Sequence, residues 1–434
     1  MSNKQKILLL LILVAALCLR VIFSVAVVGL ATGPRGDEVD YTTIAGNIAS
    51  GDGYRPANEH LTARRPPLYP LFLAFWFKIA GAHIELARIL QWLLGTLIAY
   101  LVFRLGRIVF DPPTALIAAA AVACNPFLIF ISAYALTENL YIVLVLLLLG
   151  RFALYARDAA FNARRAVVAG VLLGLAVLCR PNAFFLWIFI VAEVILYMRQ
   201  RLASRLRTGA LFLAVLFLVL LPWAWRNHAV FGEWVWFTTH GGITFYQGNN
   251  QVVMDTPQYH GSVAPLYMLP EYQRLKTLDE ITRDNEAWRL GKKFLGEEPR
   301  QVPLLVSRKL QRFWRFKSDV GMSGIKSGWW WNTNSLAGKV ASHFDAGLIY
   351  ALPVIPLFLV GLVVTRRRHR YIFLWYGVIV VHTLLAMMFF GSLRARLPLE
   401  PVMALFAAAG LIWITRRLRP AAPDSTMTST QLGG

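Results

Sequence analysis

Three carboxylates and a tyrosine lie close together near the start of the 434-residue chain, at Asp37, Glu38, Asp40 and Tyr41. They follow an apolar run, so they are expected at a membrane boundary, where a charge is costly unless it has a partner or a task. Neighbouring carboxylates repel one another unless cations neutralise them. Two interpretations are compatible. Asp37 can cap a helix that has Asp40 in its first turn, and a carboxylate here can accept the proton of an attacking hydroxyl or orient it.

Glu138 is a second candidate acid. It stands in Leu136-Thr137-Glu138-Asn139, directly before a long apolar run, and is therefore expected at the outer end of a membrane helix. From there it can approach Asp37. The alternative is that Thr137 or Glu138 only caps that helix.

Several arginines fall in connections predicted to lie outside the membrane, where basic residues are disfavoured. A membrane-anchored phosphate would account for them, because guanidinium groups bind phosphate in a bidentate way. Any single arginine can equally be explained by an internal salt bridge or by its position at the membrane interface. Taken with the acids, the arginines favour a site for an anionic lipid headgroup and a polar acceptor. They are Arg64, Arg65, Arg180, Arg226, Arg394 and Arg396.

The composition excludes an ordinary soluble protein. Hydrophobic residues make up 57% of the chain and charged residues only 15%, against about 25% charged in typical globular domains. Mean hydropathy is +0.54. The apolar residues form long uninterrupted blocks, such as 7–19 and 211–221, which predict an all-α polytopic membrane protein. The net charge of +21 comes from short basic clusters between these blocks, so it indicates topology rather than nucleic-acid binding.

Span length and the positions of basic residues together predict about ten, possibly eleven, membrane helices, with both termini cytoplasmic, in the inner (plasma) membrane. The segment Pro67 to Ala80 would reach only about 21 Å as a helix, so it is expected to be interfacial or re-entrant; an eleventh span is the alternative. Residues 166–198 are too long for one pass, and Arg180-Pro181 is expected to break them at the outer face.

Six regions follow from this topology. A stripe at Tyr41, Ile44, Ala45 and Ile48 predicts an amphipathic helix on the membrane surface, stopped at Gly51. The predicted regions are a first membrane helix (1–30), an outer loop with interfacial helices and the acidic motif (31–85), a membrane bundle (86–225), a large outer loop domain (226–345), C-terminal membrane helices (346–415) and a cytoplasmic tail (416–434).

Six short motifs, in this order, resemble the GT-C superfamily of membrane glycosyltransferases. The similarity is to its polyprenyl-phosphate-sugar-dependent branch, like glycosyltransferase family 39, which includes protein mannosyltransferases and aminoarabinose transferases of lipid A. The motifs are Gly36-Asp37-Glu38-Val39-Asp40-Tyr41, Arg65-Pro66-Pro67-Leu68-Tyr69-Pro70, Leu136-Thr137-Glu138, Cys179-Arg180-Pro181, Pro222-Trp223-Ala224-Trp225-Arg226-Asn227 and Arg394-Ala395-Arg396-Leu397-Pro398. In the last motif the family commonly has an aromatic residue where Ala395 stands.

The resemblance implies a GT-C helix bundle with sugar transfer at the outer face and inversion at the anomeric carbon. It implies that Asp37 is the catalytic carboxylate, Glu38 its neighbour in an acidic pair and Glu138 the second acid. The residues expected to contact the substrate or the lipid phosphate are Asp40, Tyr41, Arg64, Arg65, Tyr69, Arg180, Arg226, Asn227, Arg394 and Arg396.

The expected partners are a polyprenyl-phosphate sugar donor, the lipid bilayer, and an acceptor glycan, lipid or protein. Some family members use a divalent metal, but the sequence offers no convincing ligand set, since His240 and His260 have no spaced partner. Two other classes are possible: a lipid or sugar transporter (flippase), and a non-enzymatic scaffold. The chain lacks the repeated halves common in transporters, and a scaffold would not explain the acids and arginines.

Overall fold

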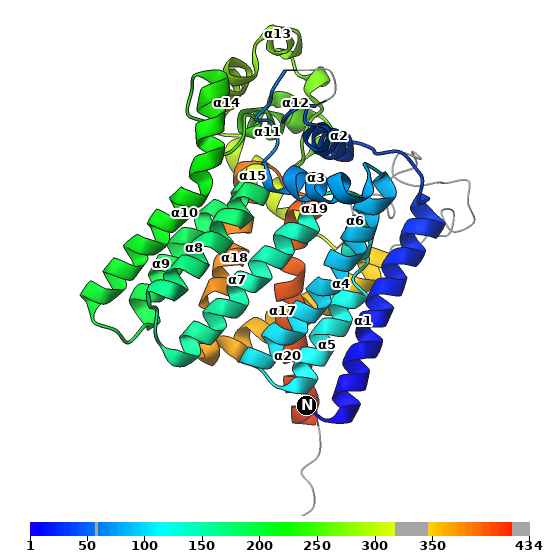
Figure 1. Cartoon of the computed structure of the whole chain (residues 1–434), viewed down its shortest axis with the longest axis vertical. Coiled ribbons are helices and arrows are strands. Elements are labelled where there is room, and N and C mark those ends of the chain that lie inside the picture. The colour runs from blue at the N-terminus through cyan, green and yellow to red at the C-terminus, as the bar shows by residue number, and fades with distance from the viewer. Residues whose placement is uncertain (57–59, 317–345, 419–434) are drawn as a thin grey trace, which may run out of the picture.

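The computed structural model describes residues 1–56, 60–316 and 346–418. Throughout these ranges the regular secondary structure is helical, with no strand, which confirms the predicted all-α class. Long helices form a bundle, and shorter helices cover one end of it (Figure 1). The predicted tail beyond residue 418 and the last part of the predicted large outer loop, residues 317–345, lie outside the described residues.

The bundle consists of helices that run along the direction between its two ends (Figure 1). Their outward side chains are aliphatic and exposed, for example Leu10, Leu218 and Val363, which is the pattern of a lipid-facing surface. The bundle helices are α1 (Asn3–Phe23), α4 (Ile84–Val109), α5 (Pro112–Ala123), α6 (Pro126–Ile131), α7 (Glu138–Asp158), α8 (Ala163–Cys179), α9 (Leu186–Tyr197), α10 (Leu202–Phe231), α17 (Ala346–Thr365), α18 (His369–Met388) and α20 (Glu400–Leu418).

Six segments of the described chain are long and apolar enough to cross a membrane. One of them, Gly347–Met388, contains both α17 and α18, with three arginines at the turn between them. The chain is therefore a polytopic membrane protein. The exact count of ten or eleven spans stays a prediction, because α5, α8 and α9 are each shorter than a typical span.

One end of the bundle carries the short helices, and we call it the covered end. Figure 1 shows α2 and α3 there, together with the helices of the large loop. The basic clusters of the C-terminal end of α4, the α17–α18 turn and the C-terminal end of α20 lie at the opposite end. The covering helices are α2 (Asp37–Ser50), α3 (Leu68–Ala80), α11 (Gly241–Gly248), α12 (Gln251–Asp255), α13 (Tyr272–Thr277), α14 (Glu280–Glu297), α15 (Val302–Trp314) and α19 (Leu393–Arg396).

Helix α3 has 13 residues and lies across the covered end, as its length predicts. Helix α2 ends at Ser50, and the next residue, Gly51, has a positive φ of 93° that terminates the helix. The apolar stripe of α2 is the predicted one, but its setting differs from the prediction. Tyr41 and Ile44 are buried within the protein, and Tyr41 packs edge-to-face on Tyr69 of α3 at 5.3 Å. The stripe therefore docks α2 on α3 rather than on lipid.

The predicted break at Arg180-Pro181 is present. Helix α8 ends at Cys179, Arg180 is extended, and a 3₁₀ turn at Pro181–Phe185 leads into α9. The proline cannot continue the hydrogen-bonding pattern of α8, so the chain turns at this point. The break leaves Arg180 at the covered end of the bundle, near the start of α7.

Topology can be tested with engineered cysteines at the two ends of the bundle. Phe75→Cys in α3 should react with a membrane-impermeant maleimide added outside intact cells, whereas Arg107→Cys near the end of α4 should react only after permeabilisation. Both parent side chains are exposed. The unaltered chain, with its three cysteines in apolar segments, is the control. Labelling of position 107 from outside would contradict the topology and would fit an eleventh span instead.

Candidate active site

Asp37 is mounted at the first residue of α2. Gly36 is the N-cap, with φ 55° and ψ −125°, a conformation that L side chains rarely adopt. The expectation that Asp37 caps the helix is therefore wrong: it is the first helical residue, and no side chain caps α2. Glu38 instead turns inward and accepts hydrogen bonds from the backbone N–H groups of Arg35 (3.1 Å) and Ala135 (2.7 Å). Asp37 is left free to face the arginines.

Two arginines bind Asp37 from opposite sides. The Nη2 of Arg65 donates to Oδ1 at 2.6 Å, and the Nη1 of Arg394 donates to Oδ2 at 2.5 Å. Burial by itself would raise the pKa of Asp37, but the positive charges of Arg394 and Arg65 outweigh it and hold that pKa well below its usual range. Asp37 is therefore an ionised carboxylate at neutral pH.

Glu138 is fully buried and also binds two arginines. Its Oε1 accepts from Nε of Arg394 at 2.5 Å and from Nη1 of Arg180 at 2.7 Å. The same Nη1 donates to the Thr137 hydroxyl at 3.0 Å. Thr137 is the N-cap residue of α7, but its side chain makes no capping hydrogen bond, and Glu138 binds arginines instead, so capping is not the only role of this pair. Glu138 holds Arg180 and Arg394 together.

Asp40 extends the same pattern toward the first loop. It accepts a hydrogen bond from Nε of Arg65 at 2.9 Å and pairs with Arg64. The result is an alternating chain, which we call the arginine–carboxylate network: Arg64, Asp40, Arg65, Asp37, Arg394, Glu138 and Arg180. It has four cations and three anions, so it carries one excess positive charge.

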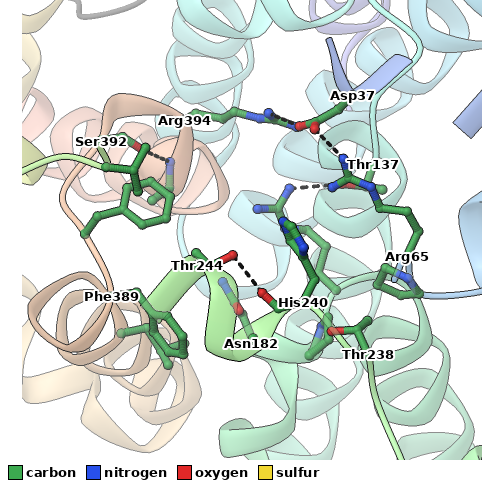
Figure 2. Close-up of a pocket in the computed structure, with 18 of the residues that line it drawn as sticks. Asp37, Arg65, Thr137, Asn182, Thr238, His240, Thr244, Phe389, Ser392 and Arg394 are labelled. Atoms are coloured by element: carbon green, nitrogen blue, oxygen red, sulfur yellow. Dashed lines mark hydrogen bonds and ion pairs between the residues drawn. The ribbon is translucent and has the colours of Figure 1, made fainter. Parts of the chain in front are cut away.

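The network borders a cavity of about 440 Å³ at the covered end. Figure 2 shows Asp37 and Arg394 at one side of it and Phe389 on another. Leu385, Ala386, Phe389 and Phe390, at and just beyond the end of α18, supply an apolar wall. A ligand with an anionic group beside a hydrocarbon group matches this combination of surfaces.

The structure places only part of the predicted set in this cavity. Five members of the network line the cavity, and so does Tyr41. These lining residues are Asp37, Tyr41, Arg64, Arg65, Arg180 and Arg394. Glu138 and Asp40 lie directly behind, each bound to lining arginines. The predicted association of the acids of the first loop, Glu138 and the later arginines is therefore seen in the geometry.

Other predicted residues are engaged elsewhere. The Tyr69 hydroxyl is buried and accepts from Gln91 at 2.5 Å. Arg226 donates to the Thr62 carbonyl at 2.8 Å, and Asn227 donates to the Val235 carbonyl at 2.9 Å. None of these three lines the cavity described above. Glu38, which faces the protein interior, does not line the cavity either, so these four residues bind other parts of the protein.

Arg396 also differs from its prediction. It is almost fully buried and donates to Glu400 at 3.0 Å and to the Arg315 carbonyl at 2.9 Å. Side chains two positions apart on a helix point to nearly opposite sides. Arg394 therefore faces the cavity, while Arg396 faces the protein interior. Arg396 thus ties the end of α15 to α20 and does not line the cavity.

The sequence reasoning missed several uncharged polar residues that line the cavity. They are Asn182, Thr238, His240, Thr244, Gln247, His382 and Ser392. The spacing of 240, 244 and 247 is that of one helical face and could have indicated three of them. Among the residues that the structure describes, no group of three or more His, Cys, Asp and Glu comes together as a metal site.

Sequence comparison finds one family. The model of the dolichyl-phosphate-mannose-protein mannosyltransferase family matches residues 64–225, which include Arg65, Glu138 and Arg180. No curated protein matches the chain. With the helical fold above, this match bears out the resemblance seen in the motifs. The match covers less than half of the chain, so the similarity to this family is shown for residues 64–225.

Comparison with solved structures finds a similar fold in an archaeal oligosaccharyltransferase. The archaeal oligosaccharyltransferase AglB of Archaeoglobus fulgidus, in complex with an inhibitory peptide and a dolichol-phosphate, is similar with a TM-score of 0.52 and 16% identity, over 96% of this chain and 51% of that chain. The Archaeoglobus fulgidus oligosaccharyltransferase tethered to an acceptor peptide has a TM-score of 0.56 and 15% identity, over 96% and 50%. ArnT of Cupriavidus metallidurans bound to undecaprenyl phosphate has a TM-score of 0.46 and 16% identity, over 94% and 78%.

The chain spans about half the length of the oligosaccharyltransferase chains that it matches. At these identities the likeness concerns the fold, so the role of each side chain has to be argued from the geometry of this chain itself.

The network makes a prediction for stability. Arg394→Met leaves the buried Glu138 with Arg180 alone and should destabilise the protein by about 3–5 kcal/mol, the usual cost of breaking a buried ion pair. The measurement is the thermal unfolding midpoint in detergent. The double variant Arg394→Met/Glu138→Gln should recover part of the loss. Arg55→Met, which removes an exposed pair, should change little. Equal midpoints for Arg394→Met and Arg55→Met would contradict the network's structural role.

Proposed function

We propose that this chain is an integral-membrane glycosyltransferase that moves a sugar from a polyprenyl-phosphate-linked donor to an acceptor hydroxyl, with inversion. The observation that carries the proposal is the excess positive charge of the arginine–carboxylate network beside an apolar cavity wall. A lipid phosphodiester supplies one negative charge, and its hydrocarbon chain suits the wall formed by Leu385, Phe389 and Phe390.

Arg180 and Arg394 are the proposed phosphate ligands. Within the described residues, the hydrogen bonds of the Arg180 guanidinium group are made by Nη1, so Nη2 is available to an anion in the cavity. Arg394 lies within hydrogen-bonding distance of both Asp37 and Glu138. A phosphate placed between the two guanidinium groups would receive the short, charge-assisted bonds that these groups form with anions.

The chemistry follows from the charges. An acceptor hydroxyl oxygen bonds to the anomeric carbon while the bond from that carbon to the phosphate oxygen breaks, and the hydroxyl proton passes to Asp37. The lipid phosphodiester leaves as a phosphomonoester and gains negative charge. Arg180 and Arg394 then bind the leaving group more strongly in the transition state than in the ground state, which is the condition for catalysis.

The two arginines on Asp37 also bear on its basicity. With Arg65 and Arg394 bound, its pKa is low and it is a weak base. A phosphate that takes over hydrogen bonds from Arg394 removes one of these cations from Asp37. The carboxylate then becomes more basic at the time when the donor is in place.

We infer that the covered end faces outward from the plasma membrane. The support is the distribution of charge: three basic clusters lie at the opposite end, which the positive-inside rule assigns to the cytoplasm. An outward site lets the donor lipid enter from the outer leaflet and gives access to acceptors of the cell envelope.

Asp37→Asn tests the proposal directly. In proteoliposomes with membrane extract as the acceptor and a panel of radiolabelled polyprenyl-phosphate sugars as donors, transfer should fall at least about 100-fold, the lower range for loss of a general base. Binding of polyprenyl phosphate should stay within a few-fold of the parent. Asp52→Asn, at an exposed position of the same loop, is the matched control and should keep full activity. Undiminished transfer by Asp37→Asn would overturn the catalytic assignment.

A further inference from the structure

One side of the cavity carries polar side chains that have no charge and no part in the network. They come from the turn after α8, from the segment before α11 and from α11 itself. Figure 2 shows four of them on the side of the cavity away from Asp37 and Arg394. The set is Asn182, Thr238, His240, Thr244 and Gln247.

Three of these residues form one face of α11. His240 precedes the helix, Thr244 lies four positions on and Gln247 three further, which is the spacing of side chains that stack along one side of a helix. All three line the cavity. The opposite face of α11, with Ile243 and Tyr246, is buried in the apolar core of the large loop.

Much of the hydrogen-bonding capacity of this set is unused. Within the described part of the chain, the side chains of Asn182, His240 and Gln247 make no hydrogen bond, although each is only partly exposed. An amide group offers two donors and an acceptor carbonyl, and a neutral imidazole offers one of each. Because these three side chains line the cavity, a polar ligand bound there would pair with their unused donors and acceptors.

His240 contributes no charge. Burial, with the positive charges of Arg65 and Arg64 nearby, lowers its pKa to about 3, so the imidazole is neutral at pH 7. The remaining acid on the cavity lining, within the described residues, is Asp37, which two arginines neutralise. No lining group is therefore left to pair with a cationic sugar.

Helix α11 is held rigidly in place. Asp284 of α14 accepts from the backbone N–H groups of Gly242 (2.7 Å) and Ile243 (3.2 Å) and so caps α11 from outside. A Cβ at Gly242 would lie 2.0 Å from the Asp284 carbonyl oxygen, so this approach requires glycine. At the other end, Asn249 donates to the Met388 carbonyl of α18 at 3.0 Å. A fixed polar face costs little ordering when a ligand binds.

We infer that Asn182, His240 and Gln247 form the subsite for the donor's sugar ring and bind an uncharged pyranose through its hydroxyl groups. The inference rests on the proposed function. Each sugar hydroxyl both donates and accepts, as these side chains do. Asn182 stands two residues after Arg180, so a ring attached to a phosphate at Arg180 lies within reach of it. The cavity volume is in the range of small-ligand sites, enough for a sugar with its phosphate.

The test compares lipids with and without the sugar. Full-length protein in nanodiscs is titrated with polyprenyl phosphate, polyprenyl-phosphate mannose and polyprenyl-phosphate glucose. The parent should bind at least one of the sugar-bearing lipids several-fold more tightly than the bare phosphate. Gln247→Met and Asn182→Leu should each weaken binding of that lipid about fivefold to tenfold, the effect of one hydrogen bond, and leave the bare phosphate unchanged. Gln251→Met, at the start of α12 and paired with Asp255, is the matched control and should change neither.

Three results would overturn the subsite. One is a parent that binds bare and sugar-bearing lipids equally. Another is a pair of variants that keep the parent's preference. The third is an equal loss for the bare and the sugar-bearing lipid, which is the result of a purely structural role. A parent that binds none of the three lipids would instead contradict the proposed function, and the subsite would fall with it.

Discussion

The site depends on one guanidinium group that holds two carboxylates at once. Arg394 bonds to Asp37 through Nη1 and to Glu138 through Nε, and so joins the first loop, the start of α7 and the turn before α20. A partly buried charge without a partner of opposite charge lowers the stability of the fold. Each arginine or carboxylate of the network therefore depends on its neighbour for neutralisation. This mutual requirement explains why residues separated by more than three hundred positions meet in one place.

A second layer of contacts positions the network. Glu38 holds the backbone at Arg35 and Ala135, which fixes the start of α2. Glu280 accepts from the Ala63 N–H and the Thr62 hydroxyl, both at 2.7 Å, and so anchors the loop that presents Arg64 and Arg65. Arg396, two residues after Arg394, links α15 to α20. These ion pairs and hydrogen bonds lie outside the cavity, so their effect on a ligand is through the placement of the arginines.

Sequence reasoning found the charged part of the site because a charge beside a membrane needs a physical reason. This argument singled out four charged residues: Asp37, Glu138, Arg180 and Arg394. The break at Arg180-Pro181 was predicted because proline cannot continue a helix. The direction in which a side chain points was harder. Glu38 and Arg396 share motifs with cavity residues but face the protein, since a shift of one or two residues turns a helical side chain to another side.

The uncharged side of the cavity was out of reach for a different reason. Asn182 and Gln247 are common surface residues and carry no cost that would single them out in a sequence. Their meaning comes from the packing of α11 between α14 and α18, a tertiary arrangement that composition and periodicity do not specify. The exact number of spans was equally hard to predict. Helices α5, α8 and α9 are shorter than a typical membrane span, and length alone does not show whether each one crosses the membrane.

The most direct measurement of the central claim is an experimental structure of the full chain with bound polyprenyl phosphate. The account predicts phosphate density between Arg180 and Arg394, with oxygen atoms about 2.7–2.9 Å from both guanidinium groups. It also predicts the prenyl chain along Leu385 and Phe389, and Asp37 with fewer arginine contacts than in the free protein. Phosphate density away from both arginines, with Arg394 still bonded to Asp37 and Glu138, would contradict the account.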